Sequence, residues 1–109
     1  MSEEIKIIDS LWVLKTAEGY KIGLTNNAQE DLGTITFATM PKVGQRLVKG
    51  DSLIELEAEK AVSEFSSPIS GTISAINVAA EQDLSVLNDA DQTKAWIAVL
   101  TDVDGTELQ

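Results

Sequence analysis

The chain has 109 residues, a formal net charge of −10 and 43% hydrophobic residues, enough for one small domain with its own core. The absence of histidine and cysteine excludes disulfides, thiolate metal sites, cysteine nucleophiles and imidazole general bases. The acidic balance opposes binding to nucleic acid and to anionic membrane surfaces, and no apolar run is long enough to span a bilayer. We therefore expect a monomeric, cytoplasmic protein that is not an enzyme.

Short segments of alternating apolar and polar residues, separated by turn residues, predict an all-β fold. The expected strands cover residues 11–14, 20–24, 34–38, 52–57, 61–65, 72–76 and 95–100. A short helix is expected over residues 28–32, because capping oxygens precede it at Thr25, Asn26 and Asn27 and Gly33 follows it. A second short helix is expected over residues 79–87. We expect a single domain over residues 1–109, with loose ends at about 1–8 and 102–109.

The central hairpin carries the most informative residues. Ala58, Glu59 and Lys60 connect the strand that ends at residue 57 to the one that begins at residue 61. This arrangement presents Lys60 on a rigid turn between small neighbours. Acidic residues surround the lysine in the sequence, and we expect them to attract a basic partner surface: Glu55, Glu57, Glu59 and Glu64.

The residues around this hairpin resemble the modification site of the glycine cleavage H-protein family. An acidic residue, a variable pair and a lysine–alanine step precede a strand that ends in a Ser-Pro-x-Ser-Gly turn, here over residues 57–71. The resemblance continues from Trp12 to Leu100 through the short helix, the turn at residues 40–44, Asn77, the Leu87-Asn88 pair and Trp96. Lipoyl domains of 2-oxo-acid dehydrogenase complexes are similar in looser form.

This resemblance implies an all-β, lipoyl/biotinyl-carrier-type flattened barrel of two antiparallel sheets with short peripheral helices. It implies lipoate as a covalent cofactor on Lys60, with Glu57, Glu59 and Ala61 as flanking recognition residues. The reactive sulfurs would belong to the cofactor, so a cysteine-free chain is suited to the role. The implied partners are a lipoyl ligase or lipoyl transferase, the glycine cleavage enzymes and dihydrolipoamide dehydrogenase.

Several positions depart from the family pattern. The acidic residue that follows Leu-Gly in the family is Thr34 here, and residues 90–95 replace the usual Asp-Pro-Tyr-Gly-x-Gly loop. These departures leave the lysine hairpin intact. They raise a specialised carrier role, in lipoate relay or with ADP-ribosylation and macrodomain enzymes, as an alternative to glycine cleavage.

Two further interpretations stay open. Biotin carriers have the same type of fold, although they usually place methionines on both sides of the lysine, where this chain has Glu59 and Ala61. The chain could also be an interaction module whose Lys60 stays unmodified. The two tryptophans are expected to fill the core or cover a sheet, and Asn88 to be a turn or cap residue. The aspartates at 89, 91, 102 and 104 do not form a complete calcium loop, and a solvated surface is the better interpretation.

Overall fold

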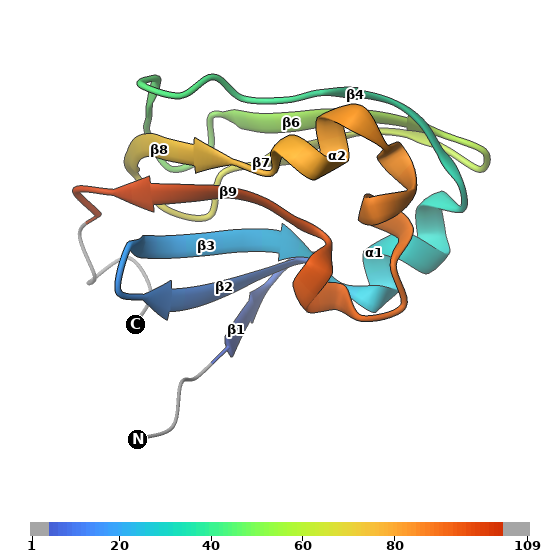
Figure 1. Ribbon diagram of the computed structural model, residues 1–109, viewed down its shortest axis with the longest axis horizontal. Helices are drawn as coiled ribbons and strands as arrows, with labels where there is room; N and C mark the ends of the chain where they lie inside the picture. Colours follow the sequence, from blue (N-terminus) through green and yellow to red (C-terminus); the bar gives the residue numbers. More distant parts are fainter. Residues whose placement is uncertain (1–4, 104–109) are drawn as a thin grey trace.

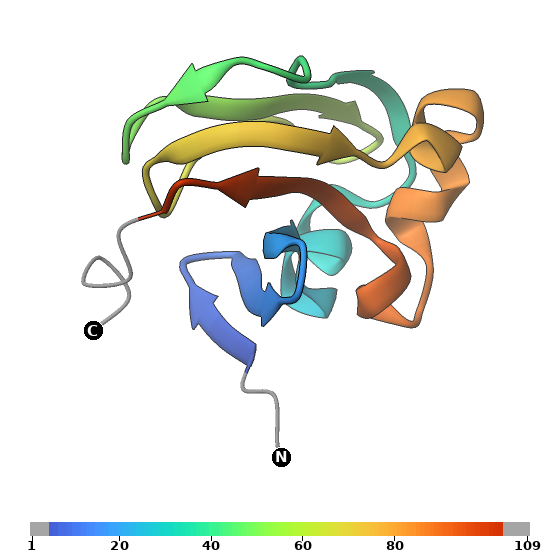
Figure 2. The same cartoon turned by 60° about the vertical axis from the view of Figure 1, so that its left-hand side comes forward.

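The computed structural model describes residues 5–103 and arranges them as two antiparallel sheets, with short helices gathered at one end (Figures 1 and 2). The larger sheet has the strand order β1-β2-β3-β9-β8-β5, and the smaller sheet has the order β4-β6-β7. This architecture confirms the predicted fold class. The strands are β1 Ile5–Ile8, β2 Leu11–Thr16, β3 Gly19–Leu24, β4 Ile35–Thr39, β5 Arg46–Leu47, β6 Ser52–Ala58, β7 Val62–Ser66, β8 Gly71–Ile76 and β9 Trp96–Thr101. The helices are α1 Asn26–Leu32, α2 Val78–Gln82 and the 3₁₀ helices η1 Leu84–Asn88 and η2 Gln92–Lys94.

The core joins apolar side chains from both sheets. Ile54 and Leu56 of β6 share one buried cluster with Ile22 of β3 and Ile97 of β9. On β6 these buried residues alternate with exposed glutamates, the period-2 pattern of a strand with one face in the core and one in water. Full burial of each such side chain contributes about 1.5–3 kcal/mol to folding.

Trp12 ties the large sheet to the segment that precedes β9. Its indole is fully buried, and Nε1 donates to the carbonyls of Leu24 at 3.0 Å and Gln92 at 3.1 Å. Gly23 lies directly opposite Trp12 in the ladder, where a Cβ would collide with the indole ring. The glycine inside β3 is therefore explained by the close approach of this ring.

The expected helix over residues 79–87 is wrong in its continuity, because it is divided at Asp83 into α2 and η1. The Asp83 carboxylate accepts from the Ser85 amide at 3.0 Å, and such side-chain bonds compete with the helical backbone ladder. Asp91 caps η2 in the same way through the Thr93 amide at 3.1 Å, in a segment expected to be a loop.

Two strands were not predicted. β1 lies within the segment expected to be a loose end, yet Ile5–Ile8 pairs with β2, Ile5 being opposite Leu14. β5 has two residues and pairs with β8, so it is too short to give a periodic signal. Of the second expected loose end, residues 102–109, the structure describes residues 102 and 103, and Val103 packs against the core. Residues 1–4 and 104–109 lie outside the described residues. Within residues 5–103, no helix is long and apolar enough to cross a membrane.

Candidate functional site

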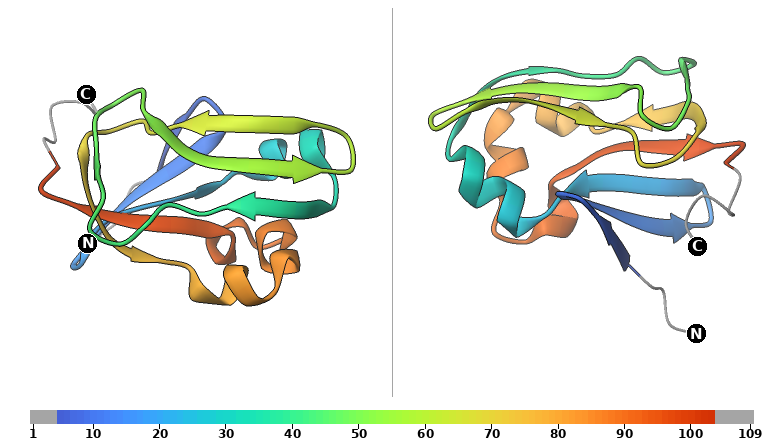
Figure 3. Two further views of the ribbon diagram at one scale, coloured as in Figure 1. Left: turned by 90° about the horizontal axis from the view of Figure 1, so that it is seen from above. Right: turned by 180° about the vertical axis from the view of Figure 1, so that it is seen from behind.

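Lys60 lies at the tip of the β6–β7 hairpin. Glu57 is opposite Val62 in the ladder, and the hairpin closes through the Ala58 amide, which donates to the Ala61 carbonyl at 2.9 Å. The tip projects at the end of the molecule that also holds α1 (Figure 3). Lys60 is exposed there, so another protein can reach its amine.

The backbone of the tip is fixed to the last residue of α1 and to the connection that follows it. The Lys60 amide donates to the Leu32 carbonyl at 2.9 Å, and the Glu59 amide donates to the Thr34 carbonyl at 2.8 Å. These bonds join residues far apart in the sequence and add to the hairpin's own ladder. The lysine is consequently presented from a rigid base.

Gly33 lets this segment approach the tip. It caps α1 with a φ of 74°, a left-handed conformation that strongly favours glycine. A Cβ at this position would lie 3.0 Å from Oε1 of Glu59 and 3.2 Å from Cγ of Lys60. The helix stop that the sequence predicted is therefore also one wall of the lysine site.

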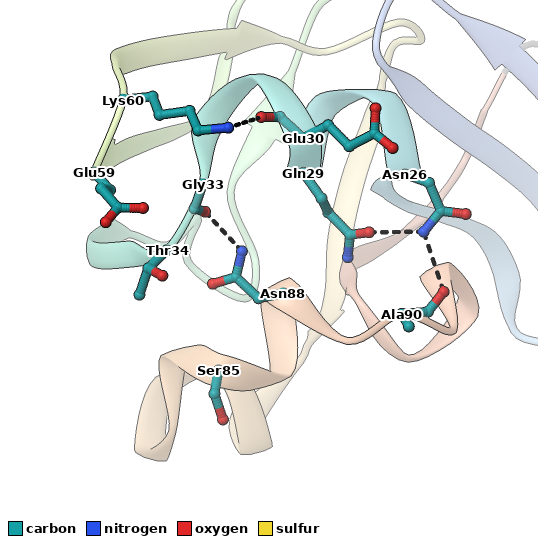
Figure 4. A pocket seen from close by; sticks show the side chains of 10 residues that line it. All are labelled: Asn26, Gln29, Glu30, Gly33, Thr34, Glu59, Lys60, Ser85, Asn88 and Ala90. Carbon is teal, nitrogen blue, oxygen red and sulfur yellow. Dashed lines mark hydrogen bonds between the residues drawn. The ribbon is translucent and has the colours of Figure 1, made fainter.

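Asn88 holds the other side of the same segment. Its Nδ2 donates to the Gly33 carbonyl at 2.7 Å (Figure 4). Its Oδ1 accepts from the Ile35 amide at 2.9 Å. Gln29 adds a parallel link, since its Nε2 donates to the carbonyls of Leu87 at 2.9 Å and Asp89 at 2.8 Å. Together these bonds clamp η1, α1 and the start of β4 into one support for the hairpin tip.

The Lys60 ammonium binds the C-terminal turn of α1. Nζ donates to the Glu30 carbonyl at 3.1 Å. This carbonyl belongs to the last four of the helix, which have no partner within the helix and carry its negative partial charge. The contact directs the lysine side chain along the edge of α1.

A groove of about 590 Å³ opens beside the lysine. Figure 4 shows its walls, which come from α1, the α1–β4 connection, the hairpin tip and η1. Most of the residues that line it have polar side chains: Asn26, Gln29, Glu30, Gly33, Thr34, Glu59, Lys60, Ser85, Asn88 and Ala90. A groove of this size can receive a small organic group attached to the lysine.

The residues predicted to flank the lysine are distributed over two faces. Glu59 lines the groove with Lys60, whereas Glu57 points outward from β6 and Ala61 is half-buried at the base of the tip. Glu55 and Glu64 are opposite each other, one row farther from the tip. The predicted acidic surround therefore separates into a groove residue and an outward sheet face.

Sequence reasoning did not assign Gly33, Asn88, Gln29 or Glu30 to the site. Gly33 and Asn88 were singled out, but only as a helix stop and as a turn or cap residue. Asn88 lies 55 positions from Gly33 in the chain, so no local pattern could reveal that they bond. Within residues 5–103, no cluster of three or more acidic side chains could hold a metal ion.

Known proteins resemble the chain over nearly its whole length. The family profile described as "Glycine cleavage H-protein" matches residues 3–109. The glycine cleavage system H protein of Listeria welshimeri is 36% identical over 97 residues, covering 89% of this chain and 78% of that protein. The one from Bacillus pumilus is 35% identical over 98 residues, covering 90% and 77%.

A solved structure shares the fold. The crystal structure of a glycine cleavage system H protein from Mycobacterium marinum superposes with a TM-score of 0.78 and 30% sequence identity. The superposition covers 92% of this chain and 85% of that one.

Proposed function

Because this chain belongs to the glycine cleavage H-protein family, we propose that Lys60 is the lysine to which its lipoyl group is attached. Proteins of this family are lipoyl carriers without catalytic activity of their own. One observation carries the assignment to Lys60: its amine is exposed at a hairpin tip whose backbone is bonded to the α1–β4 connection.

The residues around Lys60 are suited to a lipoyl arm, that is, the lysine side chain with the lipoyl group attached to it. The lipoyl group supplies a dithiolane that accepts electrons or a transferred group, which this cysteine-free chain does not offer by itself. Glu30, Thr34 and Asn88 would form the walls against which the arm lies in the groove. The fixed tip would keep the arm at high local concentration for any enzyme docked beside it.

Attachment changes the charge of the site. Forming the amide requires the free amine of Lys60 to attack an activated acyl group, whose leaving group departs, and the ammonium proton is lost. The product is a neutral amide, so the charge-assisted bond from Nζ to the Glu30 carbonyl is lost or weakened. Acylation would therefore free the side chain from the edge of α1.

A specialised carrier role is the second candidate, favoured by Thr34. In the family this position after Leu-Gly is acidic, whereas here a hydroxyl lines the groove. An arm loaded with a cationic aminomethyl group would find one carboxylate fewer in this wall. This favours lipoate relay, or service to ADP-ribosylation and macrodomain enzymes, over glycine cleavage with its decarboxylating and aminomethyl-transferring partners and dihydrolipoamide dehydrogenase.

The attachment site is tested by intact mass. The wild-type chain and the variants Lys60→Ala and Lys60→Arg are purified from lipoate-fed cells that contain a lipoyl ligase. Wild type should gain the mass of one lipoyl group and both variants none. Wild type that stays unmodified, while a control carrier is lipoylated in the same cells, would leave an unmodified interaction module as the better description.

The pathway is tested by reconstitution. The lipoylated chain is mixed with the glycine cleavage enzymes of one bacterium, beside that bacterium's own H protein. Glycine decarboxylation far below that of the native carrier, despite complete lipoylation, supports the specialised role. A comparable rate would assign the chain to glycine cleavage.

A further inference from the structure

The outward side of the β4-β6-β7 sheet is not covered by any helix of the described residues (Figure 3). Residues directly opposite in an antiparallel ladder share a face, so the register defines this side. Phe37, Glu57 and Val62 form the row next to the tip, and Glu55 is opposite Glu64 in the following row. We call these five residues the outer face.

Two large apolar side chains of the outer face are turned to solvent. Phe37 is 54% exposed and Val62 is 73% exposed, and they lie on either side of Glu57. Phe37 also lines a hollow of about 530 Å³ together with Met40, Pro41 and Val43. The face therefore alternates exposed apolar and acidic side chains, a combination suited to a protein partner that offers both apolar contact and basic groups.

The carboxylates of the outer face are not neutralised within the molecule. In the region from residue 5 to residue 103, no ion pair is formed by Glu55, Glu57 or Glu64. Glu55 and Glu64 are a like-charge pair directly across the ladder, an arrangement that destabilises a sheet. A partner with lysines or arginines at the rim of its contact would relieve this repulsion.

We propose that the outer face docks the lipoyl ligase that modifies Lys60, through an apolar contact at Phe37 and Val62 and a basic rim facing Glu55 and Glu64. This inference rests on the proposed function. A ligase must select Lys60 from chemically identical amines, and the lysine alone offers no basis for selection. The other candidates in the chain are Lys6, Lys15, Lys21, Lys42, Lys49 and Lys94.

The outer face meets the needs of such selection. It begins at Glu57 and Val62, in the row next to the hairpin tip, so an enzyme seated on it lies beside the turn that carries Lys60. It is also complete before any lipoyl group is attached, whereas an enzyme that uses the loaded arm can recognise the arm itself. The groove lies on the α1 and η1 side of the tip and is not part of the outer face.

The test measures lipoylation kinetics of the unmodified chain with a lipoyl ligase that modifies a control carrier. The variant Phe37→Ser/Val62→Thr removes the apolar contact, and Ile7→Thr/Val48→Thr is its control, with similar exposed side chains on or beside the larger sheet. The variant Glu55→Gln/Glu64→Gln removes the acidic pair, and Glu18→Gln/Asp102→Asn is its control with two exposed carboxylates elsewhere. Circular dichroism and thermal melting establish that each variant is folded.

We expect kcat/KM for Phe37→Ser/Val62→Thr to fall about tenfold, mainly through KM, with its control unchanged. Glu55→Gln/Glu64→Gln should lower kcat/KM and also reduce its dependence on salt, beyond any effect of its control. Equal kinetics for wild type and both test variants would overturn the docking face and leave Lys60 as the site. A wild type that the ligase does not modify would overturn both proposals.

Discussion

At the residue scale, Gly33 has two separable functions. Its φ of 74° lets the chain turn at the end of α1, and its lack of a side chain leaves room for the tip of the β6–β7 hairpin. Gly33→Ala should lower the free energy of unfolding by about 1–3 kcal/mol from backbone strain. It should also displace Glu59 and Lys60 and slow lipoylation. Urea unfolding and ligase kinetics measure the two effects.

Gly50→Ala is the matched control for this substitution. Gly50 also has a positive φ, of 96°, but no atom lies within 4 Å of a Cβ built there. The Gly50→Ala variant should be less stable than wild type. Its lipoylation rate should be unchanged when it is assayed well below its melting temperature. If both alanine variants are lipoylated at the wild-type rate, the contact of Gly33 with the tip does not position the lysine.

Asn88 supplies both a donor and an acceptor to the strand that begins beside the tip. Asn88→Ala should cost about 1–3 kcal/mol, because the Gly33 carbonyl and the Ile35 amide both lose their partner. Asn88→Asp keeps the acceptor for Ile35 but not the donor for Gly33. Hydrogen exchange at the Ile35 amide should therefore accelerate in the alanine variant and much less in the aspartate variant. Equal acceleration would mean that the Oδ1 bond is not what protects this amide.

At the element scale, the two 3₁₀ helices near the groove depend on aspartate caps. Hydrogen bonds from the Ser85 side chain and then its amide lower the pKa of Asp83 below its ordinary value of 3.8. Bonds from the Thr93 side chain and amide lower the pKa of Asp91 in the same direction. A depressed folded-state pKa means that the stabilisation is present above pH 3.8 and is lost as the pH falls through the lower folded value.

We therefore expect wild type to lose stability in strong acid faster than Asp83→Asn/Asp91→Asn. The asparagines can still accept the capping bonds but do not titrate. Thermal melts between pH 7 and pH 2.5 measure the difference in melting temperature between the two proteins. This difference should not change near neutrality and should grow below about pH 4. Parallel curves down to the lowest pH would show that these caps contribute no acid sensitivity.

The elements that the sequence predicted are those with a local signal. Alternating burial identifies β6 and β8, and the capping oxygens before residue 28 with Gly33 after it identify α1. The continuous helix over residues 79–87 was wrong because the Asp83 side chain competes with the backbone, which composition alone does not show. Lys60 could be placed at a hairpin tip, but its groove depends on bonds between distant segments such as η1 and the α1–β4 connection.

At the scale of the whole molecule, the chain has a net charge of −10, and the carboxylates of the outer face form no ion pair within residues 5–103. Removing any two of them relieves general repulsion, which extends about 10 Å in 0.1 M salt. Glu55 and Glu64 carry an additional local cost because they are cross-strand neighbours. The loss of stability caused by this exposed pair is explained if Glu55 and Glu64 also serve binding.

Glu55→Gln/Glu64→Gln should consequently be more stable than Glu18→Gln/Asp102→Asn, although both variants remove two negative charges. The difference should be about 0.2–1 kcal/mol in urea unfolding at low ionic strength, the range for opposed like charges in a ladder. It should shrink in 1 M salt, where the Debye length falls to about 3 Å and screens the pair. If the two variants are equally stable at low salt, the cross-strand pair carries no local repulsion, and relief of that repulsion cannot contribute to docking. The same variants thus measure, in the free protein, the repulsion between Glu55 and Glu64 that a basic partner is proposed to relieve.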